Sequence, residues 1–454
     1  MNIDTGATAW VLASGALVLF MTPGLAFFYG GMVRAKSVLN MLMMSFGAIA
    51  LVSVLWVLYG YSLAFGPDVY NGLIGNLDYV GLTKAIEATT MPEGGIPLTV
   101  FAAFQLMFGV ITVALISGAI ADRAKFGAWM VFVALWATVV YFPVAHWVFF
   151  FDGGEGGWIA DRLGALDFAG GTAVHINAGA AGLALAIVLG RRQGWPKERF
   201  RPHNLPLVLL GAGMLWFGWF GFNAGSALAA NGQAGLAFVN TQAATGAAVI
   251  SWLIVEKLRD KHATTLGAAS GAVAGLVAIT PACAAVNPLG ALAIGAAAGM
   301  ICALAVSLKY KIGLDDSLDV VGVHLFGGLV GSLLIGFFAT SVATGILTPD
   351  DPTDGANGYI YGGGWDLLTK QAVAAGAVLG YSFLATLVIG YLVRFTIGFR
   401  VGIEDEVTGI DQAVHAESGY DLAGGATQAS GRGGLSRSGA VLSVRRPPWG
   451  KPAP

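Results

Sequence analysis

Two histidines, His175 and His324, are the residues of this chain whose type and spacing most clearly suggest chemistry. They lie in matching apolar stretches, VHINAGAAG from Val174 and VHLFGGLVG from Val323, with glycines four and seven positions after each histidine. An imidazole can donate or accept a hydrogen bond, and ionisable side chains in apolar spans usually mark a pathway. The duplication therefore predicts a paired functional site rather than two unrelated core histidines.

The elements that position these histidines are predicted to be membrane helices. Of 454 residues, 56% are hydrophobic and only 11% are charged, which is too few to cover a globular core with polar surface. Cys283 and Cys302 lie in apolar runs, so we expect neither a disulfide framework nor a cysteine metal site. The polar residues before Trp10 lack a basic segment, and no cleavable signal peptide is expected.

Apolar windows of about 20 residues predict eleven transmembrane helices. They lie near residues 9–31, 38–65, 98–120, 127–150, 167–189, 205–228, 237–256, 264–285, 288–308, 318–345 and 367–394. The connections on one side carry nearly all the basic residues, and by the positive-inside rule that side is cytoplasmic. These residues include Arg34, Lys36, Arg123, Lys125, Arg191, Arg201, Lys257 and Lys309. With an odd number of spans, the N-terminus is outside and the C-terminus is inside.

The opposite face is predicted to be acidic. Its connections contain Asp68, Glu87, Asp152, Glu155 and Asp161, with few basic residues among them. Such a field enriches cations near the outer mouth, within a screening length of about 10 Å at ordinary salt. The field favours cations without identifying one.

Eleven spans divide naturally into five spans, five inverted spans and one final helix. The fold class we predict is therefore an all-α integral membrane protein with two inverted five-helix repeats, about 9–190 and 205–345, and a last helix at about 367–394. In that division His175 and His324 occupy equivalent spans, and inversion would bring them together near the midplane. The small glycines would let their helices approach closely.

The residues around the histidines suit a weak acid more than a permanent ion. Bare potassium or sodium would need rings of oxygen ligands. Ammonium could instead be held by aromatic faces and a hydroxyl, lose its proton and cross as neutral ammonia. Cation–π contacts contribute about 2 kcal/mol when desolvated. Residues of the necessary kinds in the spans are Phe104, Phe108, Phe149, Trp219, Phe222 and Ser226.

Three aspartates are expected to fix the fold near the histidines. Asp167 opens the fifth span, where its carboxylate could cap helix N–H groups, and Asp316 and Asp319 open the tenth in the same way. A different class of protein also remains open, since paired intramembrane histidines suit the axial ligands of haem. The absence of further paired histidines argues against a two-haem electron path, and an optical spectrum would decide.

Six strings of the chain resemble signatures of the ammonium transporter family, the Amt/Mep/Rh group, and within it bacterial members of the Amt branch. They are MTPGLAFFYGGMVRAKSVLNM from Met21, ADRAKF from Ala121, LDFAGGTAVHINAG from Leu166, WFGFNAGSA from Trp216, ITPACA from Ile279 and DDSLDVVGVH from Asp315. The resemblance covers nearly all of residues 9–421.

The resemblance implies a homotrimer in the inner membrane of a bacterium, with one ammonium pore per subunit. It implies no enzyme activity, metal, cofactor or nucleic-acid partner. Phe108 and Phe222 would form a phenylalanine gate, and His175 and His324 would line the pore behind it. The remaining roles are an outer ammonium site of Ser226, Phe108, Phe149 and Asp167, and supporting positions at Trp219, Asn223, Asp316 and Asp319. Transport is electrogenic in several members of the family.

One position departs from the family pattern. The outer site usually includes a tryptophan at the end of the fourth span, and alignment places Phe149 there. Phenylalanine gives a weaker cation–π face and has no N–H donor. Trp147 or Trp158 could substitute, because the inserted FDGGEGG stretch leaves the alignment ambiguous at this point.

The C-terminal part divides into two segments. Residues 1–400 are the predicted membrane domain, and 401–423 resemble the family's cytoplasmic extension, which couples subunits and helps a PII-type signalling protein to dock. Residues 424–454 are Gly/Ser/Arg/Pro-rich and are predicted to be disordered. A sensor of ammonium availability is the alternative within the family. Loss of a nitrogen response with retained uptake, after deletion of the residues following Gly424, would support it.

Overall fold

Helices account for the regular structure of the computed structural model, which describes residues 3–87, 95–198, 200–345 and 355–420. No strand occurs among these residues, which contain only isolated bridges. The α-helices are α1 (Thr5–Met32), α2 (Val38–Leu55), α3 (Tyr61–Phe65), α4 (Thr83–Glu87), α5 (Leu98–Ile116), α6 (Phe126–Trp136), α7 (Phe142–Phe149), α8 (Asn177–Leu189), α9 (Leu205–Gly225), α10 (Gly232–Asp260), α11 (Thr265–Ile279), α12 (Pro288–Ile312), α13 (Phe326–Phe338), α14 (Ser341–Thr344), α15 (Asp366–Thr396) and α16 (Ile403–Thr408).

Short turns of 3-10 or π geometry join or extend these helices. They are η1 (Ala35–Ser37), η2 (Trp56–Gly60), η3 (Val80–Leu82), η4 (Ser117–Ile120), η5 (Ala137–Tyr141), η6 (Trp158–Arg162), η7 (Gly171–Ile176), η8 (Val321–Leu325), η9 (Tyr359–Tyr361) and η10 (Asp411–His415).

Ten continuous helical segments in the described residues are long and apolar enough to cross a membrane. They are Thr5–Met32, Ala35–Phe65, Leu98–Ile120, Phe126–Phe149, Gly171–Leu189, Leu205–Gly225, Gly232–Asp260, Pro288–Ile312, Val321–Phe338 and Asp366–Thr396. Each matches one of the eleven spans expected from the sequence, with shifted ends.

The span expected at 264–285 is shorter in the structure, because helix α11 ends at Ile279. Pro281 follows two residues later and has no N–H to donate, so the α-helical hydrogen bonding cannot continue. The chain proceeds through 3-10 bonds instead, such as Ala282 N to Ile279 O at 2.9 Å. The fifth span likewise begins at Gly171 rather than at residue 167, which leaves Asp167 ahead of the helix.

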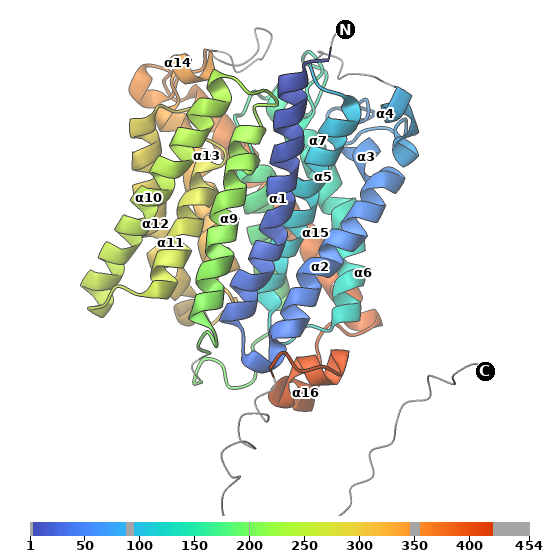
Figure 1. Ribbon diagram of the computed structural model, residues 1–454, viewed down its shortest axis with the longest axis vertical. Helices are drawn as coiled ribbons and strands as arrows, with labels where there is room; N and C mark the ends of the chain where they lie inside the picture. Colours follow the sequence, from blue (N-terminus) through green and yellow to red (C-terminus); the bar gives the residue numbers. More distant parts are fainter. Residues whose placement is uncertain (1–2, 88–94, 199, 346–354, 421–454) are drawn as a thin grey trace, which may run out of the picture. The chain divides into compact units, whose positions relative to one another are not determined.

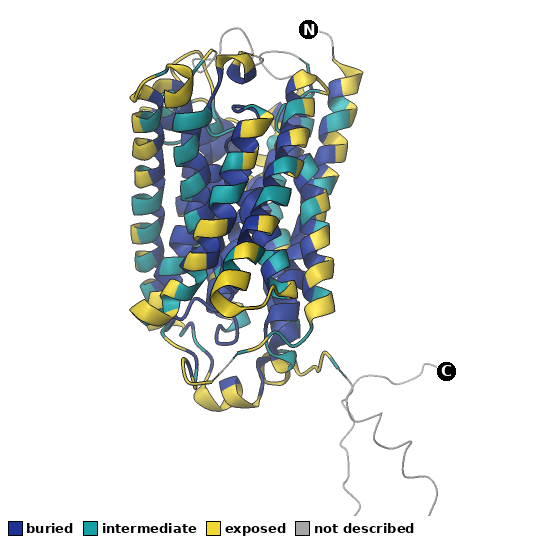
Figure 2. Cartoon of the chain, turned by 90° about the vertical axis from the view of Figure 1, so that its left-hand side faces the viewer, coloured by how far each residue is buried: buried dark blue, intermediate teal, exposed yellow. Residues whose placement is uncertain are grey.

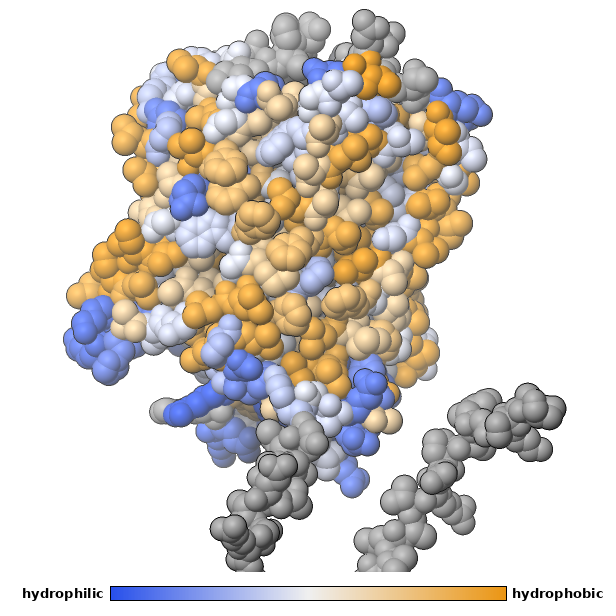
Figure 3. Space-filling view, in the orientation of Figure 1, coloured by the Kyte–Doolittle hydropathy of each residue, from blue (hydrophilic) through white to orange (hydrophobic). Residues whose placement is uncertain are grey.

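Polar caps and apolar surfaces explain why these segments form packed helices. Asparagine side chains cap the N-termini of α9, α10 and α12, where Asn204, Asn231 and Asn287 each accept a hydrogen bond from a backbone N–H three residues later. Buried residues face the interior of the bundle (Figure 2). Hydrophobic side chains cover the middle of the face shown in Figure 3, and hydrophilic ones gather toward its ends. This distribution suits a lipid-embedded bundle.

Helix α1 packs along α9, although α1 ends at Met32 and α9 begins only at Leu205 (Figure 1). A Cβ atom at Gly24 of α1 would lie 2.8 Å from the Cβ of Met214 and 3.2 Å from the backbone nitrogen of Leu215, so only glycine permits this approach. α4 and α14 lie at one end of the bundle and α16 at the other (Figure 1).

The chain divides into two units, Met1–Gly419 and Tyr420–Pro454, and every contact described below lies in the first. The tail expected at 424–454 lies outside the described residues, as do 421–423 of the expected extension.

Candidate functional site

The two histidines lie in direct contact at the centre of the site. The Nδ1 atoms of His175 and His324 are 3.4 Å apart, and the rings are stacked with centroids 5.4 Å apart. Both side chains are buried. His175 lies on η7 and His324 on η8, and both turns have π-helical geometry, which occurs often at functional sites. The pairing expected from the duplicated motif is thus present in the fold.

The glycines four positions after each histidine explain how the helices come this close. A Cβ atom at Gly179 would lie 2.5 Å from the backbone nitrogen of Leu325, and one at Gly328 would lie 3.1 Å from the nitrogen of Ile176. Each glycine therefore packs against the residue that follows the other histidine. A reciprocal contact of this kind is what a two-fold relation between two segments produces.

When both histidines are neutral and joined by one hydrogen bond, the pair keeps one N–H donor and one nitrogen acceptor for another molecule. Only one of the two Nδ1 atoms can carry the hydrogen that joins His175 to His324. The histidine whose Nδ1 accepts this hydrogen has its own proton on Nε2, and the other has a bare Nε2. His175 Nε2 is buried and has no hydrogen-bond partner among the described residues. A small molecule that both donates and accepts hydrogen bonds matches this pair.

Two phenylalanine rings lie beside the histidines. Phe108 of α5 and Phe222 of α9 have ring centroids 4.3 Å apart, and Phe222 lies 6.2 Å from His175, centroid to centroid. Trp219, one turn before Phe222, stacks on His175 at 5.5 Å. The expected gate residues are therefore in contact with each other and adjacent to the histidines.

The phenylalanine pair separates two cavities. One, here called the vestibule, has a volume of about 550 Å³ and is lined by Phe108, Phe149, Asp167 and Ser226, among others. The other, here called the narrow cavity, has a volume of only about 10 Å³, close to the space that one water molecule needs. Phe222, Trp219 and both histidines line it, with apolar side chains such as Leu215 and Val273.

The narrow cavity does not fit the haem alternative. About 10 Å³ is far below the volume of a porphyrin, and no space separates the two imidazole rings for a metal between them. No group of three or more His, Cys, Asp or Glu residues with metal-binding geometry occurs in the described part of the chain.

Phe149, rather than a tryptophan, lines the vestibule beside Phe108. The centroids of these two rings lie 6.4 Å apart. Trp147 donates its indole N–H to Leu73 O at 2.8 Å and packs against Trp158, and neither tryptophan lines the vestibule. Ser226 also lines the vestibule. Its hydroxyl donates a hydrogen bond to Phe222 O at 2.8 Å, so the hydroxyl oxygen can still accept a hydrogen bond from another group.

Asp167 binds the start of the histidine-bearing turn η7. Its carboxylate accepts backbone N–H bonds from Gly170 at 2.8 Å, Gly171 at 2.6 Å, Thr172 at 2.7 Å and Ala173 at 3.3 Å, and it also accepts the Thr172 hydroxyl. Gly170 supplies the turn with a φ of 119°, which a side chain would disfavour. Asp167 therefore fixes the segment that carries His175.

Asp316 plays the equivalent part for His324. Its carboxylate accepts the N–H groups of Val320 at 3.1 Å and Val321 at 2.8 Å, at the start of η8. Asp319 does not share this role but pairs with Lys309 at 2.5 Å. Each half of the chain therefore has one aspartate that caps its histidine-bearing turn, just as each half has one glycine that packs against the other half.

Trp219 and Asn223 hold α9 against neighbouring helices. The Trp219 indole N–H donates to Thr280 Oγ1 at 2.8 Å, and the Asn223 amide donates to Thr241 Oγ1 at 2.9 Å. Both bonds are buried. They join the helix that carries Phe222 to the residues Thr280 and Thr241.

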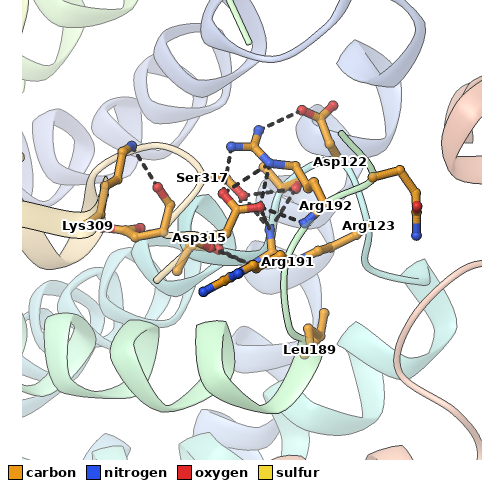
Figure 4. A network of polar contacts seen from close by, with 12 residues as sticks. Asp122, Arg123, Leu189, Arg191, Arg192, Lys309, Asp315 and Ser317 are labelled. Carbon is orange, nitrogen blue, oxygen red and sulfur yellow. Dashed lines mark hydrogen bonds and ion pairs between the residues drawn. The ribbon is translucent and has the colours of Figure 1, made fainter. Parts of the chain in front are cut away.

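A buried cluster of charges at the α16 end of the bundle did not emerge from the sequence (Figure 4). Arg192 forms hydrogen bonds to Asp315 at 2.8 and 3.0 Å and to Asp122 at 3.1 Å, while Arg123 donates to Ser317 Oγ and to Asp315 O. Burial raises the pKa of Asp315, but hydrogen bonds and charge from Arg192 outweigh it and hold that pKa below its usual value. The cluster joins the loop that follows the His175-bearing segment, which carries Arg192, to the loop that precedes the His324-bearing segment, which carries Asp315.

The segment after Arg400 packs against this same end. The Glu406 carboxylate is buried, pairs with Arg400 and accepts the backbone N–H of Gln193 at 2.7 Å. Asp411 accepts the N–H groups of Leu39 and Asn40 at the start of α2, at 3.0 and 2.8 Å. The described part of the C-terminal extension therefore packs against the start of α2 and the loop after α8 of the same chain.

Comparisons with known proteins agree with one another. Residues 9–420 match the model of the Ammonium Transporter Family. The chain is 62% identical over 437 residues to an ammonium transporter of Mycobacterium tuberculosis, with 92% of this chain and 91% of that protein covered. It is 46% identical over 419 residues to an ammonium transporter of Bacillus subtilis, with 92% and 99% covered.

Solved structures give the same grouping. The crystal structure of Saccharomyces cerevisiae Mep2 superposes with a TM-score of 0.81 at 34% identity, covering 89% of each chain. A sensor Amt protein superposes with a TM-score of 0.81 at 28% identity, covering 90% of this chain and 98% of that one.

Proposed function

This chain belongs to the ammonium transporter family, and we propose that it captures ammonium in the vestibule, releases a proton near Phe108 and Phe222, and conducts ammonia past His175 and His324. The observation that carries this proposal is the order of the cavities. A wide vestibule, the pair of contacting rings of Phe108 and Phe222, and a narrow cavity with two histidines follow one another.

The vestibule suits a cation. Its lining includes the carboxyl-bearing residues Asp152 and Asp167, the rings of Phe108 and Phe149, and the hydroxyl of Ser226. Carboxylates raise the local concentration of cations, and aromatic faces hold a cation that has shed part of its water. Because the vestibule is roomy, an ion can enter with much of its hydration shell.

The narrow cavity suits a neutral molecule. A bare charge in so apolar a space would lose its hydration without gaining oxygen ligands. Neutral ammonia loses far less hydration free energy than an ion does. Its N–H groups can donate to the acceptor nitrogen of the histidine pair, and its nitrogen can accept the pair's N–H hydrogen. Potassium has no neutral form, so the same cavity excludes it. Whether the released proton also crosses decides if transport carries net charge.

We also propose how the chain crosses the membrane and assembles. We place eleven crossings with the N-terminus outside, the C-terminus inside and two inverted repeats, which the reciprocal glycine contacts and the paired caps at Asp167 and Asp316 support. A homotrimer in the inner membrane of a bacterium and a PII-type partner at the cytoplasmic face complete it. The packed extension around Glu406 and Asp411 supports a regulatory role at that face.

Purified protein in liposomes provides the test of function. On a rapid rise in external ammonium we expect a transient current, or an internal pH shift faster than in protein-free liposomes, and neither response to an equal rise in potassium. A potassium response equal to the ammonium response would contradict deprotonation before passage. No response of either kind from folded protein would refute transport.

Replacing Phe149 with tryptophan is expected to tighten ammonium binding in the vestibule. Tryptophan offers the best cation–π face, and a gain of about 0.7 kcal/mol would lower the half-saturating ammonium concentration about threefold. Phe151 also lines the vestibule but is 43% exposed, so Phe151→Trp is the matched control. An unchanged half-saturating concentration in Phe149→Trp, or an equal drop in the control, would show that Phe149 does not face the bound ion.

A further inference from the structure

We propose that Val273 limits the size of the molecule that passes the two histidines, so that ammonia crosses and methylamine is held back. The inference rests on the proposed function and deepens it, because it names the class of substrate that the narrow cavity admits, a neutral molecule with a single heavy atom. Val273 lies on α11, is 2% exposed, and lines the narrow cavity together with His175 and His324.

The volume of the narrow cavity sets the size limit. About 10 Å³ is close to the space that one water molecule needs. Ammonia, like water, has one heavy atom, whereas methylammonium that released its proton would cross as methylamine, with a methyl group on the nitrogen. A methyl group that enters a closely packed apolar space must displace the side chains around it. One extra methylene in an apolar site changes a rate by about 10- to 200-fold.

Three side chains make part of the cavity wall stiff. Ile111, Val174 and Val273 are β-branched, and each is at most 2% exposed. A β-branched side chain in a helix strongly prefers one χ1 rotamer, so it cannot turn its methyl groups aside at low cost. Met21 and Leu215 also line the cavity, but their longer and more flexible side chains can adapt. The three β-branched side chains therefore resist an added methyl group most strongly.

Val273 is the one of these three side chains that can be shortened without altering a histidine-bearing turn or the proposed gate. Val174 packs against the start of η7, since a Cβ atom at Gly170 would lie 2.5 Å from Val174 Cγ2. Ile111 follows Phe108 by three residues, so the two are neighbours on the same face of α5. Val273 lies within the regular helix α11, which packs against both η7 and η8.

Val277 provides a matched control one turn further along α11. It is buried like Val273 but is not among the residues that line the narrow cavity. Its side chain packs against α13 instead, where a Cβ atom at Gly327 would lie 3.0 Å from Val277 Cγ1. Val277→Ala therefore removes the same two methyl groups from the same helix without enlarging the narrow cavity.

The ratio of the methylammonium-evoked response to the ammonium-evoked response in proteoliposomes tests the proposal. At saturating concentrations we expect a ratio of about 0.1 or lower in the wild type, and a rise of about tenfold in Val273→Ala. In Val277→Ala the ratio should stay within about twofold of the wild-type value. Val273→Ile adds a methylene group to the wall, so it should lower the ratio by about threefold or more.

Thermal midpoints identify the folded variants, and both alanine variants should melt below the wild type by similar amounts, since each loses the same buried methyl groups. A wild-type ratio in folded Val273→Ala would overturn the size limit, as would an equal rise in Val277→Ala. If Val273→Ala fails to fold, a ratio in Val273→Ile at or above the wild-type value would overturn it. A wild type that responds equally to both ions would overturn the size limit alone. A wild type silent to ammonium would overturn the proposed function and this inference with it.

Discussion

Replacing Asp167 with alanine is expected to lower ammonium transport at least about a hundredfold. The carboxylate accepts four backbone N–H groups at the start of η7 and the Thr172 hydroxyl, and alanine can accept none of them. Each buried N–H left without a partner costs about 1–3 kcal/mol, so the turn should rearrange. His175 lies on this turn, and a shift of about 1 Å in a positioning element can cost a hundredfold in rate.

The control for this prediction is Asp152→Ala. Asp152 also lines the vestibule, so its removal takes the same formal charge from the cavity without removing the cap of η7. We expect less than about a threefold loss of transport in this variant, because charge at the vestibule wall acts through a screened field. Ammonium-evoked currents at matched protein amounts would compare the two. Equal losses would show that Asp167 acts through its charge, and a fully active Asp167→Ala would refute the positioning role.

The sequence predicted the parts of the site that repeat or follow a helical pattern. The duplicated VH motif with its glycines indicated that His175 and His324 meet, and the glycines do lie at the reciprocal contacts with Leu325 and Ile176. Apolar length predicted each of the ten long spans. Span ends were less predictable, since Pro281 shortens α11 and Asp167 lies outside the helix that it caps.

Other features could not be derived because they depend on tertiary contacts. The two Nδ1 atoms face each other across turns of π-helical geometry, η7 and η8, and no residue pattern distinguishes such turns from ordinary helix. The buried cluster of Arg192, Asp122 and Asp315 joins loops far apart in the chain. In the sequence these charges look like solvated loop residues.

Loss of both histidine rings is expected to block the path of ammonia. Removing both rings takes away the donor and acceptor of the narrow cavity and leaves apolar walls. Ammonia would then lose its hydrogen bonds on entering, at a cost of several kcal/mol, so transport should fall more than a hundredfold. Because both side chains are buried, the oligomeric state and thermal midpoint of the variant must be checked beside its activity.

The ammonium-evoked current should therefore be compared between proteoliposomes that contain wild-type protein and proteoliposomes that contain the His175→Ala, His324→Ala double variant. We predict a transient current in the wild type that is lost in the folded variant. If neither protein gives a current but only the wild type shifts the internal pH, ammonia crosses along the histidines without a net charge. A double variant that folds and transports ammonium at the wild-type rate would show that ammonia does not depend on the two histidines to cross.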